Sequence, residues 1–298
     1  MAALTSRGRT TPSLGTKLVQ AISWAGYVGG GIVTPTLAAK AATRRWQRLP
    51  SNAGRRKDNR PYPGHIQTLE VGLPSPLVVE TWGDAGPLVY LCHGWGGWRG
   101  QVAGFVHPLV QHGFRVVSAD FYSHGDSPAG RYGPHRSTGG EMIECFNALV
   151  QTVGQPHGLV GHSLGCAIAA QLLASGAASA QRLALVAPSP DMRWASEVFA
   201  KSLGFNRHTT KLMQQVIVQS TGCSFAQFDV ATLAASGRLP SGLVVHDKAD
   251  KEVRYQVALD IVAAWPEAQL MTTDGLGHHR ILIDQVVIDQ VVAFISSK

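Results

Sequence analysis

The sequence predicts an α/β protein with a mostly parallel central sheet and helices on both faces. From about residue 64 onward, short apolar runs rich in β-formers alternate with helical patterns, which is typical of that architecture. The composition, 45% hydrophobic and 15% charged over 298 residues, is that of a globular chain and excludes a disordered or coiled-coil one. We therefore expect a main domain at 64–298 preceded by a shorter segment at 1–63.

Seven short apolar runs have the length and composition of strands. In chain order they are Leu77–Thr81, Leu88–Cys92, Arg115–Ala119, His157–Val160, Arg182–Val186, Gly242–His246 and Ala268–Thr272. Helical patterns between and after them cover Gln101–His112, Gly140–Thr152, Leu164–Ser175, Arg254–Ala264 and Asp284–Ile295. The alternation breaks at about 191–240, where a long helical stretch replaces an ordinary connection. We interpret this stretch as a functional cap insertion.

The positive charge of the chain lies in its first part. Residues 1–62 hold eleven of the 26 Lys and Arg and one acidic residue, a net charge of +10, whereas the remaining chain has a net charge of −3. The main domain has no basic run and no nucleic-acid-binding motif, which argues against nucleic acid as its partner.

The first 63 residues are expected to form a basic helical arm and a linker. The 22 residues between Lys17 and Lys40 carry no charge, but glycines and polar residues make them a poor membrane span. We expect a helix that is interrupted at Gly29–Gly31, resumes through Leu37–Leu49, and packs on the domain or rests on an anionic membrane surface. A signal peptide is the alternative, because basic residues precede and small residues follow the uncharged stretch. Pro50–Pro63 is rich in turn formers and is interpreted as the linker.

The four cysteines are far apart and form no C-x-x-C pair. Cys92 and Cys166 lie in apolar stretches, where a small buried side chain fits. We interpret all four as reduced, which favours a cytoplasmic location, with peripheral membrane contact through the arm, over secretion.

A candidate nucleophile follows the predicted strand at 157–160. Gly161-His-Ser163-Leu-Gly165 matches G-x-S-x-G and leads into a helix of small residues. This motif needs its serine on a sharp strand-to-helix turn, and the glycines leave room where a side chain would collide with neighbouring backbone. Ser163 is therefore the predicted nucleophile.

A serine nucleophile needs a histidine base and an acid that orients it, and after a G-x-S-x-G motif they follow in the order acid, then histidine. Asp250 lies in a loop beyond the predicted strand at 242–246, where its carboxylate can reach an imidazole. Asp247 and Glu252 compete for this role. Asp247 directly follows the strand, so we interpret it as a turn residue and prefer Asp250.

His278 is the candidate base. It follows Ser163 and Asp250 in the chain, and the glycines before it suit a loop that carries it over the sheet. His279 is its rival. The other ten histidines are interpreted mostly as loop or hydrogen-bonded polar positions.

An acyl-transfer site also needs two backbone N–H donors for the oxyanion, one of them from the residue after the nucleophile. Leu164 provides that donor. The second is expected from His93-Gly-Trp95-Gly-Gly97, which follows a predicted strand, and Trp95 is the preferred residue. No metal or organic cofactor is required for this chemistry.

Four motifs together resemble the α/β-hydrolase fold superfamily over about residues 64–298. They are the HG loop at 93–97, the D-x-x-G-x-G-x-S-like stretch at 120–127, the acid loop Val245–Asp250, and Gly277-His278. Ser123 stands where the family usually has glycine. The resemblance implies a serine hydrolase of the esterase, lipase and thioesterase kind, with the insertion as a cap over the pocket.

The expected activity is therefore hydrolysis of a carboxylic ester or thioester through an acyl-enzyme on Ser163. Apolar residues of the insertion suggest a small apolar acyl substrate, although helical insertions also need an apolar inner face; they are Met192, Trp194, Phe199, Phe205, Met213, Phe225 and Phe228. Two alternatives stay open. One is different chemistry on the same residues, such as acyl transfer, carbon–carbon bond hydrolysis or cofactor-free peroxidase activity, and the other is a non-enzymatic binding or signalling protein.

Overall fold

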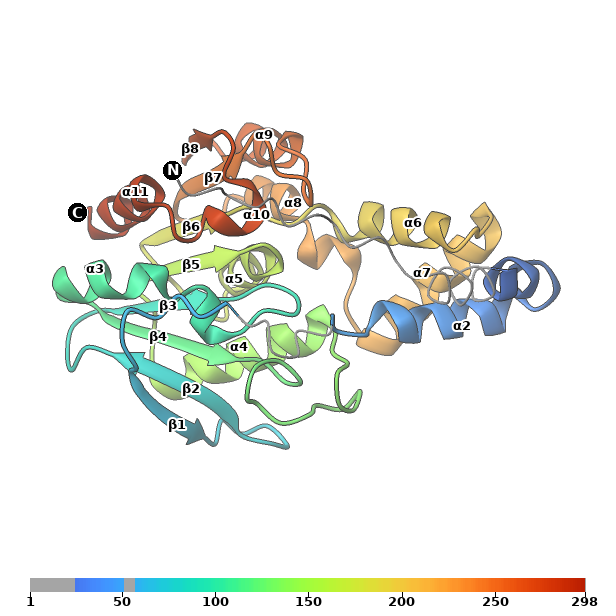
Figure 1. The fold of residues 1–298 in the computed structure, drawn as a ribbon, viewed down its shortest axis with the longest axis horizontal. Helices are drawn as coiled ribbons and strands as arrows, with labels where there is room; N and C mark the ends of the chain where they lie inside the picture. The colour runs from blue at the N-terminus through green and yellow to red at the C-terminus, as the bar shows by residue number, and fades with distance from the viewer. Residues whose placement is uncertain (1–24, 51–56, 298) are drawn as a thin grey trace, which may run out of the picture. The chain divides into compact units, whose positions relative to one another are not determined.

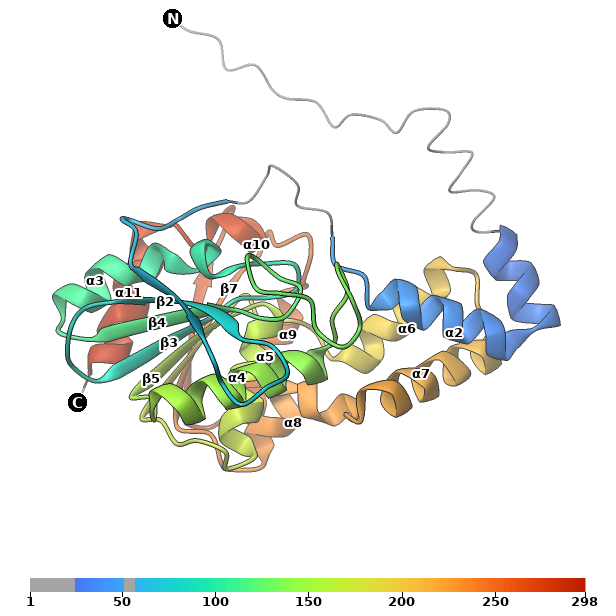
Figure 2. The same ribbon diagram turned by 90° about the horizontal axis from the view of Figure 1, so that it is seen from below.

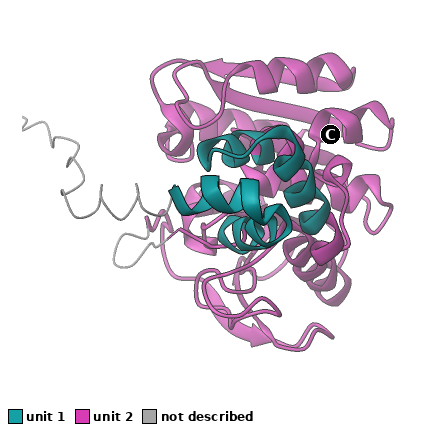
Figure 3. Cartoon of the chain, turned by 90° about the vertical axis from the view of Figure 1, so that its right-hand side faces the viewer, with its two compact units in different colours: residues 1–46, 196–217 teal, residues 47–195, 218–298 magenta. Residues whose placement is uncertain are grey.

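The computed structural model describes residues 25–50 and 57–297, and these form two compact units. The smaller unit joins residues 25–46 to 196–217, and the larger contains 47–195 and 218–297 (Figure 3). Arg7, Arg9 and Lys17, and the apolar start of the predicted arm, lie outside the described residues. The described residues contain no helix that is long and apolar enough to cross a membrane.

The larger unit is built on an eight-stranded sheet in the order β1-β2-β4-β3-β5-β6-β7-β8 (Figure 1). β1 and β2 pair antiparallel with their neighbours, and every other pairing is parallel. The strands are β1 His65–Leu69, β2 Leu77–Trp82, β3 Leu88–Cys92, β4 Arg115–Asp120, β5 Gly158–His162, β6 Arg182–Val186, β7 Ser241–Asp247 and β8 Ala268–Thr273. The predicted fold class, a mostly parallel sheet between helices, is confirmed.

Helices cover both faces of this sheet (Figures 1 and 2). α4 (Gly139–Val153), α5 (Leu164–Ala174), α8 (Val230–Ala235) and α9 (Gln256–Ala264) contribute to one apolar core. α3 (Val106–Gln111) and α11 (Gln285–Ser296) contribute to a second core that also contains side chains from the central strands. Because the central strands are buried on both faces, they are nearly continuous apolar runs, and this is why the sequence revealed them.

All seven predicted strands are present, with ends that differ by at most two residues. The prediction missed β1, an edge strand whose mostly exposed residues give no apolar run. The predicted helix at 101–112 is wrong in its first half, which forms two short turns, Arg99–Gln101 and Ala103–Phe105. Gly104 explains part of this difference, because a Cβ there would lie 2.6 Å from the Leu282 carbonyl oxygen, so the chain packs too closely for a regular helix with side chains.

The insertion at 191–240 is helical, as predicted, but its residues divide between the two units. It contains α6 (Met192–Ser202), α7 (Arg207–Thr221), the 3₁₀ turn Phe225–Phe228 and α8. Residues 196–217 belong to the smaller unit and residues 218–240 to the larger. The larger unit also holds residues 47–50 and 57–63, where Leu49 N–H donates to His135 O and Asn59 N–H to Gly100 O, each at 2.9 Å. The domain boundaries at 63 and at 191–240 stay predictions.

The predicted break in the arm is in the wrong place. Residues 25–33 are helical through the three glycines, and the break falls at Thr34, before α2 (Pro35–Trp46). Pro35 has no N–H to donate and therefore suits the first position of a new helix. Gly31 lies inside the helix, where its lack of a side chain lets Phe205 of the same unit pack against the backbone. A Cβ at Gly31 would lie 3.3 Å from a ring carbon of Phe205.

Candidate active site

Ser163 occupies a strained turn between β5 and α5. Its backbone has φ 53° and ψ −123°, in the left-handed region that L-residues other than glycine rarely adopt. Its N–H donates to Val186 O on the neighbouring strand at 3.1 Å. A Cβ at Gly161 would lie 2.7 Å from Cys166 Cα, and one at Gly165 would lie 2.7 Å from His93 O. The two glycines therefore permit the turn, as the G-x-S-x-G motif predicts.

Asp250 lies in the loop after β7, where backbone donors hold its carboxylate. Oδ1 accepts hydrogen bonds from the N–H groups of Glu252 at 2.8 Å and Val253 at 3.0 Å. Oδ2 accepts from His278 Nδ1 at 2.7 Å. Burial acts to raise the pKa of Asp250, but the hydrogen bonds from His278 and the backbone outweigh it and hold the pKa below its usual value.

Asp247 has a different role. One of its oxygens accepts from Ala249 N–H, and the other from Thr273 Oγ1 at 2.7 Å and Leu276 N–H at 2.9 Å. The carboxylate thus ties the end of β7 to the loop that leads to His278. The structure therefore pairs Asp250, not Asp247, with the candidate base.

His278 lies in the short helix α10 (Gly277–Arg280) and is buried. Its main-chain oxygen accepts a hydrogen bond at 3.0 Å from Nε2 of His162, and the two rings lie 4.9 Å apart. Because His162 directly precedes Ser163, this bond holds the histidine loop against the elbow. Ser163 Oγ itself has no hydrogen-bond partner within the described part of the chain.

The loop at 93–97 lies against the same elbow. A Cβ at Gly94 would lie 2.9 Å from Ser163 Cβ and 3.5 Å from Leu164 N, so only glycine allows this approach. Leu164 is the first residue of α5, where the backbone N–H has no carbonyl one turn earlier. Among residues 25–50 and 57–297, neither Leu164 N–H nor Trp95 N–H donates a hydrogen bond. Both predicted oxyanion donors are thus close to Ser163 in the fold and unused.

Two buried histidines that sequence reasoning missed support this loop. His93 donates from Nδ1 to Gly94 O at 2.8 Å and accepts at Nε2 from Phe121 N–H. His124 donates from Nδ1 to Tyr122 O, and its ring stacks edge-on against Trp95 at 5.7 Å. Burial lowers the pKa of His93 to about 4 and, with help from His93, that of His124 to about 3. Only their position in motifs, before Gly94 and before Gly125, could have signalled these roles.

Comparison with known proteins agrees with this geometry. Residues 87–208, from β3 through the elbow and into the insertion, match the family model described as alpha/beta hydrolase fold. This chain has the α/β-hydrolase fold.

Three relatives illustrate the likeness. A pimeloyl-[acyl-carrier protein] methyl ester esterase of Methylococcus capsulatus is 33% identical over 114 residues, which cover 38% of this chain and 41% of that protein. A thioesterase domain from the curacin biosynthetic pathway superposes with a TM-score of 0.56 at 18% identity, covering 78% of this chain and 99% of its own. A bromoperoxidase from Bacillus anthracis gives 0.56 at 13% identity, covering 78% and 99%. The matched segment is thus less than half of the esterase, and the two structures show the fold alone.

In this α/β-hydrolase-fold protein, the stretch at 120–127 has a structural role. Arg99 is buried and donates from Nε to Glu80 at 2.9 Å and from Nη1 to Asp120 and Asp126. The Asp120 carboxylate also accepts from the N–H groups of Arg99 and Asp126. Ser123, where the family usually has glycine, adopts a positive φ of 63°. The stretch therefore ties Arg99, which follows the loop at 93–97, to the sheet through a largely buried ion network.

His279, the rival base, faces other partners. Its Nδ1 lies 3.3 Å from Gln101 Nε2, and its Nε2 lies 3.1 Å from Glu252 Oε1. It therefore connects Gln101, which follows the loop at 93–97, to Glu252 in the loop after β7, while His278 contacts Asp250.

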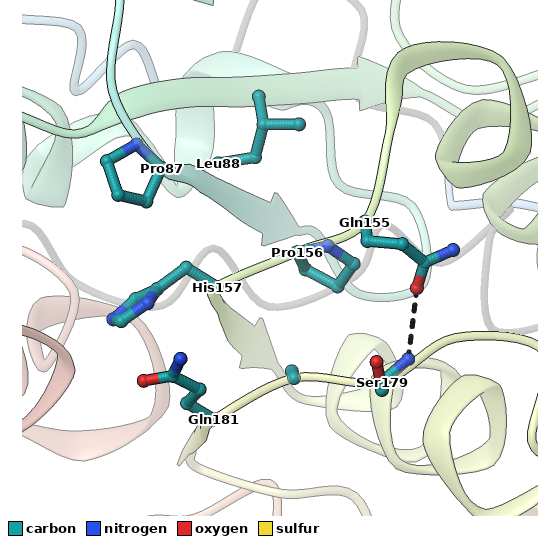
Figure 4. A pocket seen from close by; sticks show the side chains of 8 residues that line it. Pro87, Leu88, Gln155, Pro156, His157, Ser179 and Gln181 are labelled. Atoms are coloured by element: carbon teal, nitrogen blue, oxygen red, sulfur yellow. Dashed lines mark hydrogen bonds between the residues drawn. The ribbon is translucent and has the colours of Figure 1, made fainter.

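A surface pocket of about 450 Å³ lies at the end of the sheet opposite to Ser163 (Figure 4). It is lined by residues at the amino ends of the central strands: Pro87, Leu88, Gln155, Pro156, His157, Ser179, Ala180 and Gln181. Ser163, Asp250 and His278 lie at the carboxyl ends, where ligands bind in open α/β sheets. The pocket is therefore not the candidate active site. No group of three or more His, Cys, Asp or Glu in the described ranges has the arrangement of a metal site.

Proposed function

We propose that this protein is a serine hydrolase that cleaves a carboxylic ester or thioester through an acyl-enzyme on Ser163. The proposal rests on the 2.7 Å hydrogen bond between His278 and Asp250, beside a serine held on a strained strand-to-helix turn. A serine hydroxyl is a weak nucleophile, and this arrangement is the one that activates it.

The reaction follows from the atoms available. Since Asp250 accepts the proton on His278 Nδ1, the other ring nitrogen, Nε2, is the one that can take the proton of Ser163 Oγ as the oxygen attacks the carbonyl carbon. The N–H groups of Trp95 and Leu164 then stabilise the tetrahedral oxyanion. His278 returns the proton to the leaving alcohol or thiol, and a water molecule hydrolyses the acyl-enzyme by the same steps.

The relative matched by sequence supports an ester substrate, and a thioesterase domain shares the fold. One printed name is that of a methyl ester esterase and another that of a thioesterase domain. The apolar residues of the insertion give weaker support for an apolar acyl pocket than expected, because Phe205, Met213, Phe225 and Phe228 are buried. Those four are core residues, so the size of the acyl group rests on assay.

The test is hydrolysis of p-nitrophenyl esters with acyl chains of two to sixteen carbons, with acyl-CoA thioesters alongside. Wild type should peak at one chain length, and Ser163→Ala should lose at least about 10³-fold in kcat. Ser175→Ala is the matched control, because Ser175 caps the other end of the same helix. A fluorophosphonate should label wild type and not Ser163→Ala.

Retained turnover or labelling in Ser163→Ala would overturn the mechanism. Acyl transfer, carbon–carbon bond hydrolysis and peroxidase activity use the same residues, and no feature of the site favours any of them. Product analysis with water, alcohols and amines as acceptors separates hydrolysis from transfer.

A further inference from the structure

The smaller unit concentrates positive charge. Its described residues, 25–46 and 196–217, carry six Lys and Arg against a single acidic residue, Glu197, a net charge of +5. Residues 47–195 and 218–298 together carry 17 basic and 18 acidic residues, a net charge of −1. A positive electrostatic potential over a unit this small attracts an anionic surface.

The same unit exposes a cluster of large apolar side chains. Ile32, Val33 and Leu37 are 72%, 79% and 64% exposed, and they are three of the four most exposed large hydrophobic residues in the described chain. They lie at the junction between the helix at 25–33 and α2, and we call them the apolar tip. An exposed apolar cluster costs solubility, so it indicates a binding surface.

Basic residues surround the apolar tip at regular spacing. On α2, Leu37, Lys40 and Arg44 are exposed and recur at intervals of three and four, so they lie along one stripe of the helix. At 1.5 Å per residue, Lys40 lies about 4.5 Å and Arg44 about 10 Å along the helix axis from Leu37. Two cations therefore lie within roughly two turns of Leu37 on the same exposed stripe of the helix.

The first turn of α7 adds cations at the same end of the unit. Thr209 Oγ1 donates to Gly31 O at 2.9 Å, which fixes this turn beside the residue that precedes the apolar tip. Arg207 and Lys211 lie within two residues of this contact and are exposed. At i±2 they lie on the opposite face of α7 from Thr209, so they add positive charge at this end of the unit without lining the apolar tip.

We propose that the apolar tip inserts into the interfacial region of an anionic lipid bilayer, with Lys40 and Arg44 binding the lipid phosphates and the other basic residues of the unit adding long-range attraction. A bilayer fits this surface better than a second copy of the chain, because two units of charge +5 repel each other. Three side chains also bury far less than the roughly 1,200 Å² of a stable protein interface. They suffice for peripheral lipid binding when basic residues add electrostatic attraction.

The experiment is sedimentation of the full-length protein with phosphatidylglycerol–phosphatidylcholine vesicles and with phosphatidylcholine alone. Wild type should bind the anionic vesicles at least about tenfold more tightly than the neutral ones. The triple substitution Ile32→Ser, Val33→Ser and Leu37→Ser should weaken binding at least about tenfold. The matched control replaces Ile66, Ile283 and Val286, which are 46%, 56% and 67% exposed in the larger unit, and should bind as wild type does.

Other occupants give different results. If Arg7, Arg9 and Lys17 replaced by alanine abolished binding while the triple substitution had no effect, the segment before residue 25 would be the lipid contact and the proposal would be wrong. A wild-type dimer that the triple substitution makes monomeric, without change in lipid binding, would assign the apolar tip to a second copy. Equal binding of Ser163→Ala and wild type would separate this proposal from the enzymatic one.

Discussion

His162 Nε2 donates a hydrogen bond of 3.0 Å to the main-chain oxygen of His278, 116 residues further along the chain. Since a carbonyl oxygen only accepts, the proton of the neutral His162 ring is on Nε2, and its Nδ1 is buried without a partner among the described residues. Burial, together with the nearby His278, lowers the pKa of His162 to about 3. The contact between the elbow and the histidine loop therefore depends on a neutral imidazole.

We predict that acid destabilises the fold well above the pKa of ordinary carboxylates. His93, His124 and His162 stay neutral when folded down to pH 3–4, whereas unfolded histidine takes up a proton near pH 6.5. The unfolded state thus binds more protons between these pH values, so the free energy of unfolding falls as pH falls from about 6.5. Each of the three histidines should lower the free energy of unfolding by about 1 kcal/mol between pH 7.5 and pH 5.5, and urea unfolding at the two pH values measures this.

The substitution His162→Gln isolates the contribution of His162 to the pH dependence of the free energy of unfolding. Glutamine keeps an N–H donor near the position of Nε2 but does not titrate. Its pH dependence should be smaller by about 1 kcal/mol over the same interval. Asp120 and Glu141, whose pKa values burial raises, act in the opposite direction, so the comparison with wild type is what measures the histidine. An unchanged pH dependence would contradict the assignment.

Asp250→Asn and Asp247→Asn should behave differently. Asp250 accepts the Nδ1 proton of His278, so an amide there permits the wrong tautomer, and kcat should fall by about 10³–10⁴-fold. Asp247 binds Thr273, Leu276 and Ala249, so its substitution should lower stability and leave kcat within about tenfold. Kinetics and thermal melts of both variants test this, and equal losses of kcat would contradict it.

Gly165→Ala should destabilise the protein by about 2–3 kcal/mol. Its Cβ would clash with Cys92 O and lie 2.7 Å from His93 O, and backbone atoms cannot move aside as a flexible side chain can. Gly29→Ala is the control, since it also lies in a helix but its Cβ would have nothing within 4 Å. That variant should be unchanged or more stable by about 0.5–1 kcal/mol. Denaturant unfolding compares them, and equal stability would refute the packing argument.

Arg99→Ala should lower the free energy of unfolding by about 3–5 kcal/mol, because it leaves the buried carboxylate of Asp120 without its cation and Glu80 with Arg60 alone. Arg131 pairs with Glu144 at the surface, where both side chains are exposed, so Arg131→Ala should cost less than about 1 kcal/mol. Urea unfolding of the two variants provides the measurement. A loss in Arg99→Ala no larger than in Arg131→Ala would show that the network is not structural.

Local patterns in the sequence were enough to predict the sheet and the strand-to-helix turn at Ser163. A strand buried on both faces must be apolar along its length, as Leu88–Cys92 is, and a strained turn before a helix must have glycines around Ser163. The prediction missed β1 because an edge strand with exposed residues does not need a continuous apolar run. The break in the arm was misplaced because Gly31 is tolerated in a helix when its bare backbone packs on Phe205, a neighbour 174 residues away in the chain.

The sequence by itself determined the type of fold, the serine on its elbow and the order of acid and histidine in the chain. The sequence favoured Asp250 over Asp247 as the partner of His278, and the tertiary structure decided between them, because only the folded chain brings the Asp250 carboxylate to the imidazole. It also gave His162, His124 and Arg99 their partners and joined residues 25–46 to 196–217. Turns and strands follow from interactions between near neighbours, whereas these pairings depend on how the strands are ordered in the sheet.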